Sequence, residues 1–478
     1  MSVARKIAAT SLASFLLFAI CDAPFAKAAD EQQASKRVDE VFADLAKPGS
    51  PGCALAAARD GKLLYAKGYG LANIEENVPI TPQTVFDIGS TSKQFAAASI
   101  LLLEKQGKLS INDDVRKYIP ELPNYGKTIT ILNLLNHTSG LRDYLTLFEL
   151  AGVNTDNVTT DDDALNLIVR QKALNFDPGT EWLYSNTGFF LLSIIVKRVS
   201  GKTLREFAAE NIFGPLQMSA TTYRDDHTQL VPNRALAYDA KEKSAGFSLN
   251  VSYFEQTGDG AVHTSVVDLL KWDENFYTAQ VGGKEFLAEL QEPGKLNDGK
   301  VLTYAKGLSV GKYRGLQTVS HGGSWGGYRA DLLRFPEQHF SVVCLCNLGS
   351  ARPSSRAVKV AEIYLGNLMI PAKSKAATNS DDDSPKKKET VSFTNSQLSL
   401  FEGDYWSGEL EIIYRIRFES GSLVLRVKNL PPKELRPIAA DEFQLKDGLK
   451  FKMVVKEGIV SGFLLDAGRT RGMFFEKR

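Results

Sequence analysis

Residues 86–93 read Phe86-Asp87-Ile88-Gly89-Ser90-Thr91-Ser92-Lys93, and the organisation of the chain follows from this stretch. A short apolar run gives way to Ser90, and a helical pattern follows over residues 94–106. Lys93 lies one helical turn beyond Ser90 on the same face, where its amine can take the serine's proton. The positive end of the helix dipole would favour negative charge on the serine oxygen. The alternative is a serine that caps the helix beside a solvated lysine.

The pattern Ser-x-x-Lys also occurs at two further places, so the surrounding sequence must decide between them. Ser309-Val310-Gly311-Lys312 lies among glycines, with no helical pattern after it. Ser384-Pro385-Lys386-Lys387 lies in a charged segment whose composition is typical of unstructured chain. Only Ser90 opens a helix, so Ser90 is the candidate nucleophile.

The composition is that of an ordinary soluble globular protein with more than one domain. A chain of 478 residues exceeds what one core usually organises, so about two or three domains are expected. Hydrophobic residues make up 43% and charged residues 24% of the chain. The formal charge of +1 is uninformative, and the basic run at 386–388 lies close after the acidic run at 381–383, so the two cancel locally. We therefore expect no nucleic-acid partner.

The first 28 residues are predicted to be a signal peptide. Arg5 and Lys6 precede an apolar run over residues 7–20, and Ala26-Lys27-Ala28 fits a cleavage site, so the mature chain would start at Ala29. The apolar run is too short to span a membrane and nothing later supplies a span, so we expect no transmembrane anchor in the mature chain. We expect a periplasmic or extracellular protein. Lipid attachment at Cys21 is the alternative, although the residues before it fit a lipoprotein signal poorly.

Cleavage would leave three cysteines, at positions 53, 344 and 346. Cys344 and Cys346 are two residues apart in a strand-like run, which is a poor geometry for a bridge between them. We expect all three to be small, buried, apolar residues.

The order of local patterns predicts an α+β body. Two apolar runs, residues 52–58 and 62–68, are joined by Asp60-Gly61, which is a strong hairpin signal. Mainly helical patterns follow Ser90 up to about residue 230, including 161–173, 187–200 and a capping box that starts at Thr203. Strand patterns return at 317–320, 328–335 and 340–347, before a last helix at 356–368. We expect an antiparallel sheet flanked by helices, an all-helical lobe, and a cleft between them.

A second domain is predicted after a linker. Residues 372–390 contain blocks of charge and no aliphatic residue beyond alanine, which indicates a flexible linker between a domain at 29–371 and the rest. Residues 391–478 repeat short strand patterns with turns between them, so we expect a small all-β, barrel-like domain.

Two further motifs carry chemistry. Tyr184-Ser185-Asn186 directly precedes a helical pattern, and His321-Gly322-Gly323-Ser324 lies at the end of a strand pattern, where the glycines would let a ligand approach the backbone. Read alone, Tyr184 could be a half-buried tyrosine and Asn186 a helix cap.

Taken in order, Ser90-x-x-Lys93, Tyr184-x-Asn186 and His321-Gly322-Gly323 resemble the three motifs of the penicillin-recognising serine hydrolases. The resemblance is to the branch that holds class C β-lactamases, DD-carboxypeptidases, D-aminopeptidases and esterases. It covers about residues 38–368 and includes the segment Leu134-Leu135-Asn136-His137-Thr138-Ser139-Gly140-Leu141. It implies a β-lactamase/transpeptidase-like fold and a serine hydrolase that needs no cofactor.

The resemblance also implies a role for each motif residue. Ser90 would be acylated, Lys93 would activate it, and Tyr184 would relay protons to the leaving group and later to the hydrolytic water. Asn186 would hydrogen-bond the substrate amide. The backbone N–H groups of Ser90 and Ser324 would form the oxyanion hole.

The third motif departs from the lactamase pattern, in which Lys-Thr-Gly is usual. His321-Gly322-Gly323 replaces a fixed charge and a hydroxyl, both suited to a substrate carboxylate, with a titratable imidazole and a hydrogen atom. We therefore expect a hydrolase for peptide amides, possibly next to a D-amino acid, or for esters, without an obligatory substrate carboxylate. The alternatives are a cell-wall-peptide or penicillin-binding protein with little turnover, and a true β-lactamase.

Four other features have plainer interpretations. His137 is expected to support its loop, and His227, His263 and His339 lack metal-ligand spacing, so no metal is expected. Thr257-Gly258-Asp259-Gly260 would line the cleft or form a simple turn. Gly322-Gly323-Ser324-Trp325-Gly326 matches the nucleophile elbow of α/β-hydrolases, but a strand pattern follows Ser324 where that elbow requires a helix.

Overall fold

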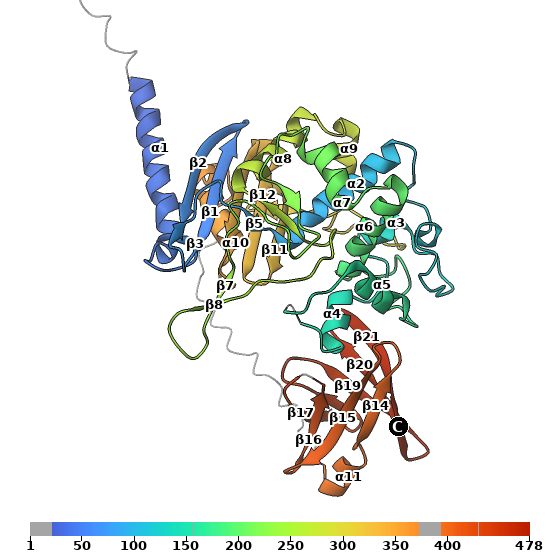
Figure 1. Cartoon of the computed structure of the whole chain (residues 1–478). Helices are drawn as coiled ribbons and strands as arrows, with labels where there is room; N and C mark the ends of the chain where they lie inside the picture. Colours follow the sequence, from blue (N-terminus) through green and yellow to red (C-terminus); the bar gives the residue numbers. More distant parts are fainter. Residues whose placement is uncertain (1–21, 155, 372–392, 429) are drawn as a thin grey trace, which may run out of the picture.

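The structure is a computed structural model that describes residues 22–154, 156–371, 393–428 and 430–478. A main body (22–371) precedes a closed β-barrel, and helix α1 (Asp22–Val41) runs along one edge of the body (Figure 1). Residues 1–21 of the predicted signal peptide and the predicted linker at 372–390 lie outside the described residues. None of the described helices combines the length and apolar character needed to cross a membrane.

A six-stranded antiparallel sheet forms the centre of the body, in the order β10-β11-β12-β13-β1-β2. Its strands come from both ends of the body, as the sequence predicts: β1 (Cys53–Arg59), β2 (Lys62–Tyr69), β10 (Ser309–Tyr313), β11 (Leu316–Trp325), β12 (Tyr328–Phe335) and β13 (Phe340–Cys346). The β1–β2 turn has positive φ at Asp60 (51°) and Gly61 (68°), which fits the predicted two-residue hairpin.

Helices cover both faces of this sheet. On one face, α10 (Pro353–Leu365) packs onto β12 and β13, and α1 packs against α10; an apolar cluster that includes Phe42 and Val360 fills this side. On the other face, α2 (Lys93–Lys105) and α8 (Val266–Thr278) share a core with the helical lobe. Helix α10 begins three residues before the predicted start at 356, because Pro353 is well suited to a first helical position.

The helical lobe lies between the two halves of the sheet in the chain. Its helices are α3 (Ile131–Leu135), α4 (Tyr144–Leu150), α5 (Asp161–Val169), α6 (Asn186–Ser200), α7 (Leu204–Ala208), which continues as a π-helical turn η4 (Ala209–Phe213), and α9 (Lys284–Leu290). The capping box at Thr203 is confirmed by its reciprocal bonds with Glu206. Helix α5 ends before the predicted end at residue 173, because the backbone N–H of Lys172 donates instead to Glu409 of the barrel, at 2.7 Å.

Short strands and turns complete the body. They are β3 (Leu71–Asn73) with β4 (Val78–Pro79), β7 (Tyr238–Ala240) with β8 (Phe247–Leu249), β5 (Phe86–Asp87) with β9 (Val262–Thr264) and β6 (Thr222–Tyr223), and the 3-10 turns η1 (Ala43–Leu45), η2 (Gly89–Ser92), η3 (Val115–Lys117) and η5 (Pro336–Gln338). The β5–β9 pairing holds the Ser90 stretch against the segment around residue 260, because Ile88 N donates to Val262 O at 3.0 Å.

The C-terminal part is a closed eight-stranded antiparallel barrel, as the sequence predicts. A short helix, α11 (Asn395–Ser399), precedes strands β14 (Gly403–Ser407), β15 (Ile412–Glu419), β16 (Ser422–Val427), β17 (Lys433–Ala439), β18 (Glu442–Gln444), β19 (Lys450–Lys456), β20 (Ile459–Ala467) and β21 (Thr470–Lys477). Pairing of β14 with β21 closes the barrel. Stacked and tilted aromatic rings of Tyr405, Tyr414, Phe451, Phe463 and Phe475 fill its interior.

The expectation for the cysteines was wrong at two positions. Cys53 and Cys346 form a disulfide, whereas Cys344 is a free, buried cysteine as predicted. The reason is the pairing of β1 with β13, which places Cys53 directly opposite Cys346 although 293 residues separate them in the chain. The sequence shows the two strands but not that they are neighbours.

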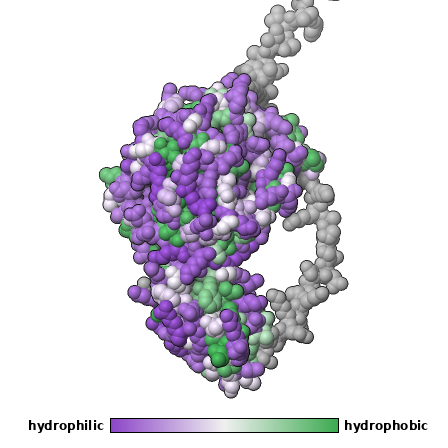
Figure 2. Space-filling view, turned by 90° about the vertical axis from the view of Figure 1, so that its right-hand side faces the viewer, coloured by the Kyte–Doolittle hydropathy of each residue, from purple (hydrophilic) through white to green (hydrophobic). Residues whose placement is uncertain are grey.

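The barrel docks on the helical lobe beside α4 and forms a smaller lobe of the molecule (Figures 1 and 2). Arg142 of the body donates to Glu409 of the barrel at 2.6 Å, and the two side chains are only 1% and 7% exposed. The same guanidinium donates to Arg471 O at 3.0 Å, and Tyr414 Oη donates to Leu150 O at 2.8 Å. A buried ion pair and backbone contacts therefore fix the barrel against the body.

Replacing Glu409 with Ala leaves the Arg142 guanidinium buried without its counter-ion. Removing one partner of a buried ion pair costs about 3–5 kcal/mol, so the free energy of unfolding should fall by that amount in urea denaturation. Glu181→Ala is the matched control, because Glu181 pairs with Arg471 across the same interface but both side chains are exposed (50% and 41%). The control should lose less than about 1 kcal/mol. Equal losses for both variants would contradict this account of the interface.

Candidate active site

Ser90 lies in the 3-10 turn η2, between strand β5 and helix α2. The N-cap position of α2 is taken by Ser92, whose side chain makes no capping bond, so Ser90 is not the cap of this helix. Gly89 has φ +48°, and a side chain there would meet Ser324 N at 2.7 Å. A glycine at position 89 thus lets the turn pack against β11 and leaves Ser90 facing a cleft.

Lys93 is fully buried behind Ser90 and holds three segments of the chain together. Its Nζ lies 3.1 Å from Ser90 Oγ, 2.9 Å from Asn186 Oδ1 and 2.6 Å from Asp259 O. The amide and carbonyl oxygens can only accept hydrogen bonds, whereas the serine hydroxyl can donate or accept. No described carboxylate forms an ion pair with Lys93. The arrangement leaves the serine as the one partner that can exchange a proton with this amine.

Tyr184 lies on a loop held by His137. The backbone N–H of Leu183 donates to His137 O at 3.0 Å and that of Ser185 donates to His137 Nδ1 at 3.2 Å. Burial moves the pKa of His137 well below its ordinary value, so this imidazole is neutral and structural, in agreement with the predicted loop support. The Tyr184 hydroxyl is buried and has no hydrogen-bond partner among the described residues. An unpaired buried hydroxyl is costly, which points to a group that a substrate completes.

Asn186 is the first residue of α6 rather than its cap, and Ser185 is the cap residue. Its backbone N–H donates to Asp143 Oδ2 at 2.6 Å, which frees the side-chain oxygen for Lys93. The alternative interpretation of Asn186 as a helix cap is therefore wrong.

Strand β11 presents a free edge to the cleft. Its pairing with β10 ends at Ser320, so over the described chain residues 321–325 are paired on one side only, with β12. Such an edge can accept an extended peptide as an added strand. A side chain at Gly323 would meet Ile88 O at 1.8 Å, so a glycine here lets the Ser90 stretch pack against β11. The close approach sets the backbone of Ser324 beside that of Ser90.

His321 is neutral at physiological pH. Its Nδ1 lies 2.6 Å from Gly322 O, which only accepts, so Nδ1 carries the proton and Nε2 accepts from Tyr304 Oη at 3.0 Å. Burial, with a smaller contribution from the charge of Lys93, lowers the pKa of His321 to about 4. The third motif therefore supplies no positive charge where the lactamase pattern has a lysine.

The glycine-rich segment at 257–260 lines the cleft. Asp259 contributes its carbonyl oxygen to Lys93 and accepts a bond at its carboxylate from Tyr144 Oη, at 3.0 Å. Burial raises the pKa of Asp259 to about 7. The sequence left open whether this segment lines the cleft or forms a simple turn. The structure shows that Asp259 and Gly260 line the cleft.

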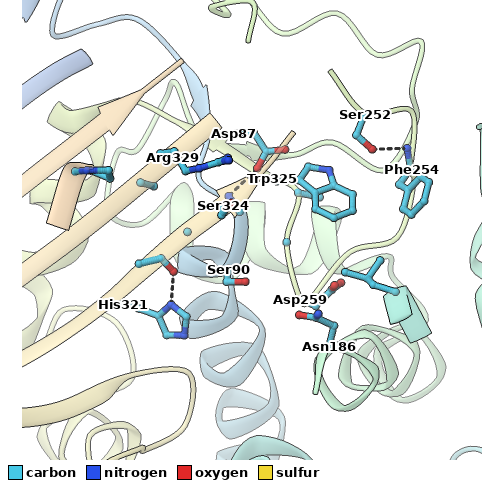
Figure 3. Close-up of a pocket in the computed structure, with 18 of the residues that line it drawn as sticks. Asp87, Ser90, Asn186, Ser252, Phe254, Asp259, His321, Ser324, Trp325 and Arg329 are labelled. Carbon is cyan, nitrogen blue, oxygen red and sulfur yellow. Dashed lines mark hydrogen bonds between the residues drawn. The ribbon is translucent and has the colours of Figure 1, made fainter. Parts of the chain in front are cut away.

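The predicted residues surround one cleft of about 680 Å³. Ser90, Tyr184, Asn186, His321, Gly322, Gly323 and Ser324 all line it. Figure 3 shows Ser90 between His321 on one side and Asn186 and Asp259 on the other. Sequence reasoning missed many lining residues, among them Tyr144 and Arg469 of the barrel, because they lie in no motif.

The competing sequence interpretations fail on geometry. Ser324 belongs to β11 and is followed by a turn and strand β12, so it is not on a nucleophile elbow. Ser309 and Lys312 lie three residues apart in strand β10, where successive side chains alternate, so they point to opposite faces. The third Ser-x-x-Lys, at 384–387, lies outside the described residues.

Within the described residues, two groups have metal-ligating atoms close together. One consists of the three cysteines, two of which are bonded to each other. The other is Asp226, His227 and Glu255, in which His227 Nδ1 lies 2.7 Å from Glu255 Oε1. Neither group lines the Ser90 cleft, and the expectation that the protein uses no metal stays a prediction.

Known proteins resemble this chain over about two thirds of its length. Penicillin-binding protein 4* of Bacillus subtilis is 30% identical over 333 residues, which are 66% of this chain and 72% of that protein. A D-aminopeptidase of Gluconobacter oxydans is 30% identical over 334 residues, 69% of this chain and 61% of its own.

Solved structures share the fold. An octameric penicillin-binding protein homologue from Pyrococcus abyssi superimposes with a TM-score of 0.61 at 22% identity, over 95% of this chain and 100% of that one. The family profile described as Beta-lactamase matches residues 38–364, which contain all three motifs. The chain therefore belongs to the beta-lactamase family, and it is a serine hydrolase.

Proposed function

We propose that the protein hydrolyses a peptide amide, one that can lie next to a D-amino acid, or an ester, through an acyl-enzyme on Ser90. The observation that carries this proposal is the contact between Lys93 Nζ and Ser90 Oγ, at 3.1 Å inside a substrate-sized cleft. A serine alcohol is a poor nucleophile until a base lies within hydrogen-bond reach.

The reaction follows from the positions of these groups. Ser90 Oγ attacks the substrate carbonyl carbon while its proton passes to Lys93. The backbone N–H groups of Ser90 and Ser324 hold the oxyanion, a contribution worth about 10²–10³ in rate per donor. Tyr184 then protonates the leaving nitrogen or oxygen, the bond to it breaks, and the acyl group stays on Ser90. A water molecule attacks the acyl-enzyme by the reverse path and releases the acid.

The third motif supports neutral substrates for this reaction. His321 is uncharged and Gly322 offers no hydroxyl, so the β11 edge lacks the lysine and threonine that suit a β-lactam carboxylate. The D-aminopeptidase relative supports an amide next to a D-residue. We infer that a peptide lies along residues 321–325, with its amide also bound by Asn186.

We also infer that the protein is exported to the periplasm or beyond. The basic, apolar and small-residue order of residues 1–28 supports a signal peptide, and the Cys53–Cys346 disulfide fits an oxidising compartment. Peptide mapping of the protein from its native host should give a mature chain that starts at Ala29. A chain that retains residues 1–28 in the cytoplasm would contradict export.

Ser90→Ala should abolish hydrolysis and covalent labelling by a fluorophosphonate, as read by intact mass. Ser324→Ala is the matched control, because Ser324 lines the same cleft but contributes only its backbone N–H. The control should keep its labelling and most of its activity. Labelling that survives in Ser90→Ala, or disappears in Ser324→Ala, would refute Ser90 as the nucleophile.

The same labelling experiment separates hydrolysis from mere binding. With D-amino amides and esters, a burst of product followed by steady release indicates turnover. A penicillin-binding protein with little turnover would give a stable adduct and no steady release instead. Steady hydrolysis of a β-lactam would favour a true β-lactamase.

The pH profile of His321→Gln tests the charge state of the third motif. A pKa lowered from 6.5 to about 4 means that His321 gains its proton only as the pH falls through about 4. Wild type and His321→Gln should therefore give kcat/KM profiles of the same shape between about pH 5.5 and 8. Any inflection due to Asp259, whose pKa is raised to about 7, is common to both. An inflection near pH 6.5 that only the wild type shows would prove this assignment wrong.

A further inference from the structure

The barrel contributes a residue to the active-site cleft. Strands β20 and β21 are joined by the two-residue turn Gly468-Arg469, and Gly468 has φ +57°, as the first position of a tight hairpin requires. Arg469 lines the same cleft as Ser90, and its Cζ lies 4.7 Å from the centre of the Tyr184 ring. Two parts of the chain therefore build one site.

The main body holds the backbone of this turn in place. Arg469 O accepts from Asn175 Nδ2 at 2.9 Å and from Asp143 N at 3.3 Å. Asn175 Oδ1 accepts from Arg471 N at 2.8 Å. The position of the arginine is thus fixed before any ligand binds, which lowers the entropy cost of using it.

The guanidinium itself is left available. Its side chain is 44% exposed and donates no hydrogen bond to any described residue. The carboxylate closest to it is Asp143 Oδ2, 3.9 Å from Nη1, and that oxygen already accepts from Asn186 N at 2.6 Å. Arg469 keeps its planar set of N–H donors, which matches a carboxylate.

The charges around the cleft favour an anion over an ammonium group. Four arginines line it: Arg224, Arg329, Arg352 and Arg469. Asp87 and Asp259 are the lining acids, and burial raises their pKa values to about 6 and about 7. Arg329 donates to the carbonyl oxygens of Gly326 and Tyr328, whereas the Arg469 guanidinium donates no hydrogen bond to a described residue, has only the 3.9 Å ion pair with Asp143, and lies against Tyr184.

We propose that Arg469 of the barrel determines specificity by binding a carboxylate on the leaving group of the substrate. The inference rests on the proposed function, in which Tyr184 protonates the leaving group, because Arg469 lies against Tyr184. The charge that the third motif lacks on β11 is supplied from the second domain. Leaving groups that carry a carboxylate are preferred over neutral ones, although neutral amides and esters remain substrates.

The test uses two aryl esters with the same acyl group. The 3-carboxyphenyl and 3-carbamoylphenyl esters of N-acetyl-D-alanine differ only in the charge of the leaving group. Wild type should hydrolyse the carboxylate ester with the higher kcat/KM. Arg469→Ala should lower kcat/KM for the carboxylate ester by about 10- to 100-fold, as expected for a charge-assisted hydrogen bond, and change that for the neutral ester by less than about 3-fold.

Arg471→Ala is the matched control, because Arg471 lies on the same hairpin but pairs with Glu181 at the surface. It should leave the preference unchanged. Equal losses on both esters in Arg469→Ala, no preference in wild type, or the same effect in Arg471→Ala would each overturn the proposal. Fluorophosphonate labelling distinguishes a failure of the Arg469 proposal from a failure of the proposed function. Arg469→Ala should still be labelled at Ser90. Wild type that is not labelled at Ser90 would contradict the proposed function itself.

Discussion

The hydrogen bonds of the Lys93 amine are the constraint on which the rest of the structure depends. Its three acceptors come from the turn after β5, the first residue of α6 and the loop before β9. These segments meet only if α2 is buried between the sheet and the helical lobe, which is where the main apolar cluster places it. A buried amine without these acceptors would be strongly unfavourable. The packing of the lobe that brings the acceptors together therefore also sets the geometry at Ser90.

The barrel is connected to this centre by direct contacts. Glu409 binds Arg142, and the next residue, Asp143, accepts from Asn186 N and donates to Arg469 O. Asn186 in turn accepts from Lys93. The same short segment of the body thus anchors the barrel and orients a residue next to the nucleophile. Asp143 therefore links the docking of the barrel to the position of Asn186 in the main body.

Much of the fold and most of the site could be predicted from local sequence. The Asp60-Gly61 turn and the helix after Ser90 follow from backbone preferences and periodicity, which short segments contain in full. The Cys53–Cys346 bridge could not be predicted, because it depends on which strands become neighbours across 293 residues. The contact of Lys93 with Asp259 O was missed for another reason. A motif describes side chains, whereas that acceptor is a backbone carbonyl, and any residue type could supply it. Arg469 was missed for the first reason, because its place beside the cleft depends on how a turn of the barrel packs against the main body.

The third motif shows how recognition can be separated from chemistry. A lysine on β11 would place a permanent charge beside the oxyanion hole, and a neutral His321 held by Tyr304 and Gly322 O removes that charge. The hydrogen bonds of the Lys93 amine do not involve the third-motif side chain, so they do not depend on its charge. A cation carried by a hairpin of the barrel can change in identity or position without disturbing Lys93. Selectivity for charge then varies with the second domain, while the reaction at Ser90 remains fixed by the first.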